Sequence, residues 1–312
     1  MSFRTLLRSA FAFIVMLFLS ATAHAQLFRA YISSVGNDAN ACTLPAPCRL
    51  LPAALNAVAS GGEIWMLDSA NYNTATVTIA KSVSILAVPG AVGSVLAIGG
   101  PAVNIAASGL TISLRNLVIV PLTGGGGTEG VYMSGASGLT IENSLIANLP
   151  SSGVYVIGTG KVEIANTIIR NNGGYAVYML NGASADISGT KMLNNVSGGV
   201  IAYSTTATTT TATVSDSVVS GGAEGVLGYA TIAGGVARVF VTRCTIQNTS
   251  YALDSETNGL GSALVAVSSS MITNNYYAWY QGGAGSVVRT LGNNHITDNT
   301  TSVGVLTPTA LQ

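Results

Sequence analysis

The stretch VEIANTIIRNNGGYAVYML, residues 162–180, sets two short apolar runs on either side of a turn made of asparagine and glycine. Apolar and polar residues alternate in the first run, and its Val and Ile residues are typical of β-strands. No apolar pattern with a period of about 3.6 residues is sustained long enough to indicate a helix. The stretch therefore predicts strand, sharp turn and strand, and variants of it recur along most of the chain.

The repeat can be followed through one apolar residue, the anchor, which lies two positions before each asparagine-type turn. The anchors are 23–27 residues apart and comprise Ile119, Ile146, Ile169, Met192, Val219, Ile246, Ile272 and Ile296. A regular period of this length marks a solenoid, and the β-like runs favour strands over helices as its building blocks. We expect an all-β parallel β-helix of roughly ten coils, stacked about 4.8 Å apart.

Two columns of turn residues explain the repeated asparagines. Two positions after the anchor the chain has Asn148, Asn171, Asn194, Gly221, Asn248, Asn274 and Asp298. Three positions before the anchor it has Asn116, Asn143, Asn166, Gly189, Asp216, Arg243, Ser269 and Asn293. Asn, Gly and Asp tolerate left-handed backbone angles, and identical amides on stacked coils can form a hydrogen-bonded ladder. Cys244 falls in a neighbouring column of Ser and Thr, which predicts a buried structural thiol.

The first 25 residues resemble an export signal, with Arg4 and Arg8 before an apolar run and Ala23-His24-Ala25 as a cleavage site. We expect cleavage near Ala25, a secreted, periplasmic or cell-surface protein, and one β-helix domain over residues 26–312. The apolar run is too short to span a membrane. Cleavage would leave ten basic and twelve acidic residues, a balance that gives no reason to expect nucleic acid as a partner.

Residues 26–62 are expected to form an N-terminal strand and a capping helix. The helix is predicted within PAPCRLLPAALNAVASGG, residues 45–62, and should end at Gly61-Gly62. Cys42 and Cys48 bracket a short loop and favour a disulfide in an oxidising compartment. Zinc is the alternative, but no further ligands surround the pair. The C-terminal TPTALQ is expected to cover the last coil.

The segment that begins YISSVGNDANAC and runs over residues 31–68, followed by these coils, resembles secreted right-handed parallel β-helix proteins of the pectin-lyase-like superfamily. The resemblance implies a right-handed helix. Better-known members act on acidic polysaccharides, which implies a glycan as the partner. The Asp cluster with Gly-His-Gly of polygalacturonase-like members is absent, as is the Asp-Pro-His-Asp motif of alginate-epimerase-like members. These absences argue against an enzyme with a standard site.

Three carboxylates are the strongest catalytic candidates. Glu163 and Asp186 both lie six residues before their anchors, so they should stack on successive coils, with Glu142 on the coil before. Three such groups can act as an acid and a base or bind Ca²⁺. The alternative is that they are solvated residues on an outer face and that the protein has no cofactor.

Tyrosines offer the main candidate binding surface. Tyr132, Tyr155 and Tyr178 share one column, and Tyr203 lies two positions further along on the next coil. They alternate with Val131, Val154 and Val177, so if the valines face the core the tyrosines face outward. Aromatic rings at coil spacing suit stacking against successive sugars. The alternative is an aromatic ladder that only stabilises the sheet.

Together these features predict a protein that binds an extended polysaccharide or cell-surface glycan along one lateral face, formed by the tyrosines with Glu163 and Asp186. A non-catalytic adhesion or structural rod is the first alternative. A polysaccharide lyase or hydrolase with a non-standard site is the second.

Overall fold

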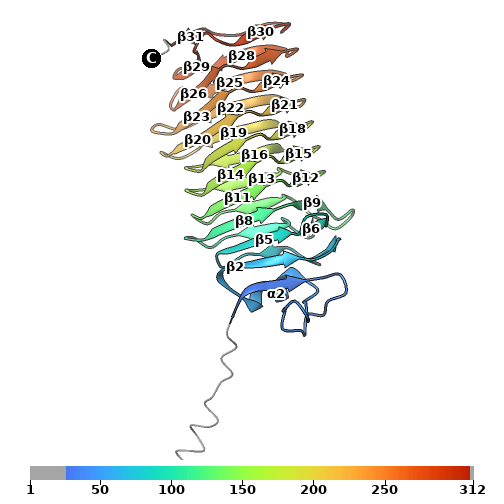
Figure 1. Ribbon diagram of the computed structural model, residues 1–312. Helices are drawn as coiled ribbons and strands as arrows, with labels where there is room; N and C mark the ends of the chain where they lie inside the picture. Colours follow the sequence, from blue (N-terminus) through green and yellow to red (C-terminus); the bar gives the residue numbers. More distant parts are fainter. Residues whose placement is uncertain (1–25, 310–312) are drawn as a thin grey trace, which may run out of the picture.

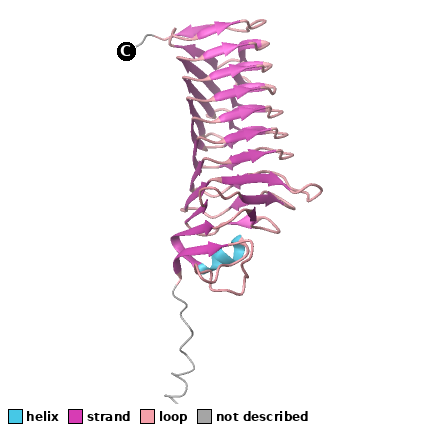
Figure 2. Ribbon diagram, turned by 45° about the vertical axis from the view of Figure 1, so that its right-hand side comes forward, coloured by secondary structure: helices cyan, strands magenta, loops and turns pink. Residues whose placement is uncertain are grey.

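The computed structural model describes residues 26–309 as a rod of stacked coils with the N-terminal helix at one end (Figure 1). Three parallel sheets run along the rod, and each coil passes through sheet I, sheet II and sheet III in turn (Figure 2). Nearly every strand pairs with the equivalent strand one coil away, as a right-handed parallel β-helix requires. The predicted fold class is confirmed, with about nine complete turns, because sheet III has nine strands.

The strands of each sheet are given in spatial order. Sheet I contains β1 (Leu27–Ile32), β2 (Val58–Met66), β5 (Val83–Ala87), β8 (Thr111–Arg115), β11 (Gly138–Glu142), β14 (Lys161–Ala165), β17 (Ser184–Ser188), β20 (Thr209–Ser215), β23 (Val236–Thr242), β26 (Ser262–Ser268), β29 (Ser286–Thr290) and β31 (Leu306–Pro308). Sheet II contains β3 (Ala70–Asn71), β6 (Gly93–Ala97), β9 (Leu117–Pro121), β12 (Leu145–Ala147), β15 (Ile168–Arg170), β18 (Lys191–Leu193), β21 (Val218–Ser220), β24 (Thr245–Gln247), β27 (Met271–Thr273) and β30 (His295–Thr297). Sheet III contains β4 (Val77–Thr78), β7 (Val103–Ile105), β10 (Val131–Met133), β13 (Val154–Ile157), β16 (Tyr175–Leu180), β19 (Gly198–Ser204), β22 (Glu224–Ala230), β25 (Tyr251–Thr257) and β28 (Tyr277–Gly282).

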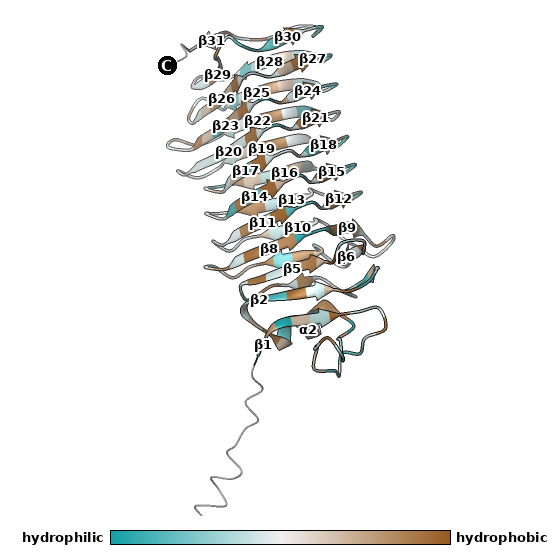
Figure 3. Cartoon of the chain, viewed as in Figure 1, coloured by the Kyte–Doolittle hydropathy of each residue, from teal (hydrophilic) through white to brown (hydrophobic). Residues whose placement is uncertain are grey.

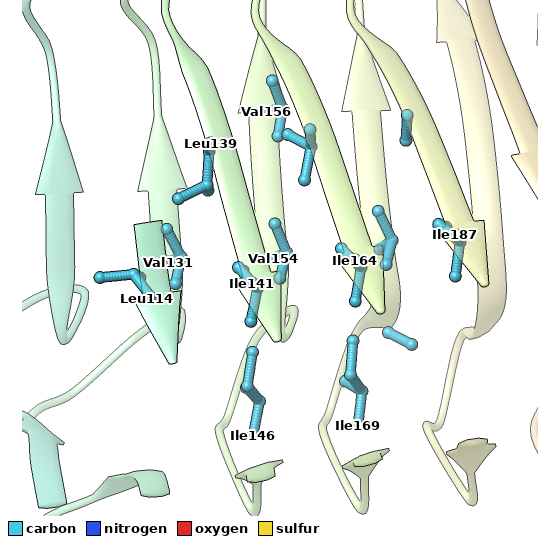
Figure 4. Packing of buried hydrophobic residues seen from close by; sticks show 14 of the residues in the cluster. Leu114, Val131, Leu139, Ile141, Ile146, Val154, Val156, Ile164, Ile169 and Ile187 are labelled. Carbon is cyan, nitrogen blue, oxygen red and sulfur yellow. The ribbon is translucent and has the colours of Figure 1, made fainter. Parts of the chain in front are cut away.

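The core fills the inside of the rod with rows of aliphatic side chains, one row for each inward position. Alternation along each strand sends every second side chain inward, and Figure 3 shows the resulting change between apolar and polar residues along the strands. One row crosses successive strands of sheet I and consists of Leu114, Ile141, Ile164 and Ile187 (Figure 4). All four side chains are at most 1% exposed. The repeat therefore buries a continuous core that no single coil could bury alone.

The two predicted turn columns are confirmed by their backbone angles. Between sheets II and III, every member from Asn148 to Asp298 has a positive φ, from 53° to 75°. Between sheets I and II, the column from Asn116 to Ser269 has φ between 48° and 56°. Asn293 is the exception, because in the last coil the left-handed angle moves to Gly292.

The amide ladder lies one residue beyond the predicted column. Asn172 Nδ2 donates to Asn195 Oδ1 at 2.8 Å, and Asn275 Nδ2 donates to Asn299 Oδ1 at 2.9 Å. In the predicted column, Asn171 and Asn148 are joined by a longer contact of 3.4 Å. The residue with the left-handed angle makes the turn, and its neighbour supplies the inward amide that bonds along the rod axis.

Cys244 is a buried free thiol, as its position in the Ser/Thr column predicts. The hydroxyls of this column donate to the carbonyl two residues back, for example Ser217 Oγ to Ser215 O at 2.6 Å. Cys244 Sγ makes the equivalent contact with Thr242 O at 3.2 Å, and Cys244 N donates to Ser270 Oγ at 3.1 Å. The thiol thus replaces a hydroxyl in a structural role.

The capping helix is present but shorter than predicted. Helix α2 covers Leu51–Ala57 and buries Leu51, Ala54 and Leu55 against the first coil. It ends at Val58, well before Gly61-Gly62, because residues 58–66 pair as a strand with β1 and β5. Cys42 and Cys48 form the predicted disulfide in the loop before the helix.

At the C-terminal end, the chain folds back over the last complete coil. Strand β31 adds to β29, and Thr301 and Val303 exchange backbone hydrogen bonds with β28. Trp279 turns inward and packs on the core. The described part of the predicted TPTALQ segment, residues 307–309, therefore pairs with the last strand of sheet I, and residues 310–312 lie outside the described residues. Within residues 26–309, no helix is long and apolar enough to cross a membrane, and the expected signal peptide, residues 1–25, lies outside the described residues.

Candidate functional site

The predicted tyrosine column lies on the outward face of sheet III. Tyr132, Tyr155 and Tyr178 are direct partners on successive strands. Val131, Val154 and Val177 point into the core and are fully buried. Tyr203 belongs to the adjacent outward column, where it pairs with Leu180. The alternation argument therefore placed all four tyrosines on the correct side of the sheet.

The tyrosine rings pack against one another along the rod. Tyr155 and Tyr178 meet edge to face with centroids 4.6 Å apart, and Tyr132 meets Tyr155 at 5.5 Å. Burial raises the pKa of Tyr178 to about 12, and it also raises the pKa of Tyr155. These phenols are half-buried, so the column is both a stabilising ladder and an outward surface.

The same face continues toward the C-terminal end with further tyrosines. Tyr203 and Tyr229 stack with their planes 7° apart, and Tyr251 and Tyr277 stack with their planes 14° apart. Because these rings stack along the rod axis, they present their edges and hydroxyls outward rather than flat faces. The aromatic strip thus spans the strands from β10 to β28 and offers mainly ring edges and phenol hydroxyls at its C-terminal end.

Three carboxyl groups lie within this strip, and sequence reasoning did not select them. Glu224, Asp254 and Glu256 project from β22 and β25 on the outward face of sheet III. Asp254 follows Ile201 and Leu227 in the column of Tyr178, between two columns of larger side chains. Ile201, Leu227 and Asp254 are only 2–5% exposed although they face outward. The flanking tyrosines and glutamates therefore remove Asp254 from water.

Burial makes Asp254 an unusual acid. Loss of water, reinforced by the nearby charges of Glu256 and Glu224, raises its pKa to about 9. Burial also raises the pKa of Glu224 and that of Glu256. Asp254 Oδ1 has no hydrogen-bond partner within the described residues. At neutral pH Asp254 is therefore a protonated carboxyl group, which can donate a hydrogen bond.

Tyr175 connects the tyrosine strip to the carboxyl group of Glu224. Its hydroxyl donates a hydrogen bond to Glu224 Oε2 across the intervening strand. The residue between them is Gly198, which pairs with both and has φ of 143°. A Cβ on Gly198 would lie 2.1 Å from the carbonyl oxygen of Glu224, too close for any side chain. The absence of a side chain at this position lets the phenol reach the acid.

Glu163, Asp186 and Glu142 lie on a different face. Glu163 and Asp186 are partners on β14 and β17 of sheet I, which confirms the predicted stacking, and both are exposed. Glu142 forms an ion pair with Arg115 at 2.7 Å. The prediction that these acids share one lateral face with the tyrosines is wrong, because each coil turns a corner between sheet III and sheet I.

Calcium was the alternative cofactor for these acids. Within residues 26–309, no group of three Asp, Glu, His or Cys side chains is arranged to hold a metal ion. Within these residues, the exposed pair of Glu163 and Asp186 therefore has no third Asp, Glu, His or Cys side chain beside it.

Comparison with known proteins places the fold. Residues 129–301 match the family described as the right-handed β-helix region, and the chain belongs to that family. No curated protein matches this sequence. The fold is that of the pectin-lyase-like right-handed β-helices.

Three solved structures share the fold at low sequence identity. The pectate lyase Pel9A is 13% identical with a TM-score of 0.56, over 92% of this chain and 79% of that chain. XylC, solved in complex with xylose, is 8% identical with a TM-score of 0.56, over 84% of this chain and 74% of that chain. An alginate lyase from Paenibacillus sp. str. FPU-7 is 13% identical with a TM-score of 0.54, over 90% of this chain and all of that chain (100%).

Proposed function

We propose that the protein binds an extended, uncharged polysaccharide along the outward face of sheet III. The carrying observation is that every strand of sheet III from β10 to β28 has at least one outward tyrosine. Half-buried phenols supply apolar contact area and hydroxyls for hydrogen bonds to sugars. Three proteins that share the fold are a pectate lyase, an alginate lyase and XylC in complex with xylose, which supports a saccharide as the ligand.

The charge of this face selects among polysaccharides. The strands of sheet III contain three carboxyl groups and no Lys, Arg or His. A polyuronate would bring its own negative charges to this surface without finding a cation. A neutral polymer meets no such penalty, so it is the better ligand for the tyrosine strip.

Affinity electrophoresis tests this proposal directly. The purified protein would run through gels that contain hydroxyethylcellulose, glucomannan or polygalacturonate, beside the double variant Tyr155→Ala/Tyr178→Ala. We expect a neutral polymer to retard the wild type and the double variant to lose that retardation. Phe28→Ala is the matched control, because it removes an exposed aromatic ring from β1 of sheet I. No retardation by any neutral polymer would leave an adhesive or structural rod as the better account.

Asp254 favours glycosidic cleavage as a second candidate function. A protonated Asp254 can give its proton to the glycosidic oxygen as the bond from that oxygen to C1 breaks. A water molecule then adds to C1, and Glu224 or Glu256 accepts the proton that it releases. The flanking side chains must swing aside, since Asp254 is 2% exposed. Release of reducing ends by the wild type, but not by Asp254→Asn, would support this reaction.

The first 25 residues support export as part of the proposal. A glycan-binding rod acts where extended polysaccharides occur, and the predicted cleavage site would release the chain beginning at Gln26. N-terminal sequencing of protein recovered outside the cytoplasm checks this: a chain that still begins at Met1 would contradict it.

A further inference from the structure

A second surface, on sheet I near the C-terminal end, has the opposite charge. Two adjoining hollows of about 270 Å³ and about 450 Å³ share Phe240, Leu264 and Arg289 as lining residues, and Arg238 lines the larger one. We call this surface the arginine hollow. The larger volume lies within the range of small-molecule sites, roughly 300–1,000 Å³.

The register of sheet I explains why the surface is hollow. Phe240, Ala266 and Arg289 are consecutive members of one outward column, on β23, β26 and β29. Ala266 is the small residue between a phenyl ring and a guanidinium group. Strands are about 4.8 Å apart, so Phe240 and Arg289 stand about 10 Å from each other across a shallow floor.

Both arginines are available to an external anion. Arg238 and Arg289 are exposed, and neither has a carboxylate partner within ion-pair distance among residues 26–309. In the column of Phe240, the nearest carboxylate toward the N-terminal end is Asp186, two strands away, with Thr213 between them. The lining of the two hollows contains no acidic residue.

The other lining groups indicate what kind of anion fits. Phe240 is 37% exposed and offers an apolar ring beside the cations. Thr242 and Ser268 line the smaller hollow and are joined by a hydrogen bond of 3.0 Å, which leaves hydroxyl capacity for a ligand. An apolar ring, two hydroxyls and two guanidinium groups match the chemistry of a carboxylated sugar.

We propose that the arginine hollow binds one carboxylated sugar unit of an acidic glycan. The sugar ring packs on Phe240, and its carboxylate accepts hydrogen bonds from Arg289 and Arg238. Guanidinium groups suit this role because their planar donors match the two oxygens of a carboxylate. This site is separate from the tyrosine strip of sheet III and takes a ligand of different charge, so either site can fail without the other.

An NMR titration that follows the Nε–H signals of arginine tests the proposal. The probe is tetragalacturonate at low salt, and the comparison ligand is its fully methyl-esterified form, which has the same rings without charge. We expect saturable shifts of the Arg238 and Arg289 signals with the acid alone. Equal shifts with the ester, or no shift with the acid, would overturn the proposal.

Variants separate this site from general charge attraction. Arg289→Gln and Arg238→Gln should each weaken tetragalacturonate binding about tenfold, because each removes charge-assisted hydrogen bonds. Phe240→Ala should weaken it as well. Arg170→Gln is the matched control, since it removes an exposed arginine from sheet II and should leave the affinity unchanged.

Two further experiments test whether the ligand must be a carboxylate and whether it binds to sheet I. A tetrasaccharide that carries sulfate groups and no carboxylate, and that binds as tightly as tetragalacturonate, would overturn the assignment to a carboxylate. The proposal would also be overturned if Tyr155→Ala/Tyr178→Ala lost tetragalacturonate binding while Arg289→Gln bound it as tightly as the wild type. That result would place the acidic ligand on sheet III. All these substitutions lie on outward positions, and circular dichroism would confirm that each variant is folded.

Discussion

The outward face of sheet III and the arginine hollow of sheet I use the same coil spacing but have opposite chemistry. On sheet III, tyrosines and glutamates stand side by side and cover Asp254, so an outward carboxyl group is 2% exposed. On sheet I, Ala266 separates Phe240 from Arg289, and the arginines stay in solvent. The size of the outward side chains, rather than the coil itself, thus decides whether an ionisable group on this rod is buried or exposed.

Asp254→Asn should give the largest effect, because it removes the most strongly buried acid. The folded pKa of Asp254 is about 9, above its ordinary value of 3.8. A pKa raised by folding gives stability that is complete below pH 4 and is lost as the pH rises through about 9. Between pH 4 and 7 this loss is on the order of 4 kcal/mol.

Asparagine does not titrate, so the variant should avoid this loss. We expect the melting temperature of the wild type to fall from pH 5 to pH 8.5 and that of Asp254→Asn to change much less. Calorimetric melting at four pH values measures this, with exposed Asp186→Asn as the control. Parallel pH profiles for the wild type and Asp254→Asn would show that Asp254 is solvated and that the contrast between the two faces is wrong.

Tyr175→Phe should destabilise the protein by about 1–3 kcal/mol, the cost of leaving a partly buried polar group unpaired. The lost hydroxyl is the donor to Glu224, and that hydrogen bond lowers the pKa of Glu224 against the effect of burial. Without it, the pKa of Glu224 should rise further. Because this hydrogen bond favours the ionised form of Glu224, destabilisation should be larger at pH 8 than at pH 4.5, and unfolding in urea at both pH values would show it.

The fold could be predicted from the sequence because its signals are local and repeated. Left-handed turns at Asn and Gly recur at a fixed distance from each anchor, and the core requires only that every second residue be apolar. The capping helix was predicted too long because pairing of Gly62 with Val83 depends on the next coil. Local helix signals do not contain that information.

The candidate site was predicted only where the coil length stays constant. Tyr155 and Tyr178 lie nine residues after their anchors, but Leu227 and Asp254 lie eight residues after theirs, although all occupy one outward column. The turn between sheets II and III loses one residue from the Val219 coil onward. A search at constant offset therefore misses Asp254, and following the alternation of YALDSET itself would have found it.

The position of Glu163 and Asp186 shows a second limit of the same kind. Their stacking follows from the period and was correct, yet their relation to the tyrosines depends on where the chain turns its corners. The repeat gives the distance along the rod but not the direction in which each sheet faces. Placing two columns on one face requires the three-dimensional fold.

Tyr155→Ala/Tyr178→Ala and Arg289→Gln should separate the two faces by ligand. Each tyrosine removed should weaken neutral-polymer binding by roughly the worth of an aromatic contact, about 0.5–1.5 kcal/mol. Binding of tetragalacturonate should stay unchanged in the tyrosine variant, and the reverse should hold for Arg289→Gln. Paired titrations with one neutral and one acidic oligosaccharide measure both. If either variant loses binding of both ligands, the two faces act as a single site, which would contradict the assignment of one ligand to each face.

Salt should give the smallest effect, and it distinguishes the faces without any mutation. Salt screens the attraction between exposed charges, because the Debye length falls from about 10 Å at 0.1 M to about 3 Å at 1 M. Binding of tetragalacturonate to exposed Arg238 and Arg289 should therefore weaken severalfold over this range. Contacts between tyrosines and a neutral polymer involve no net charge and should be unchanged or slightly stronger, which electrophoretic retardation at several salt concentrations would show. Equal salt dependence on both faces would mean that charge governs binding to sheet III as well, which would contradict the assignment of a neutral polymer to that face.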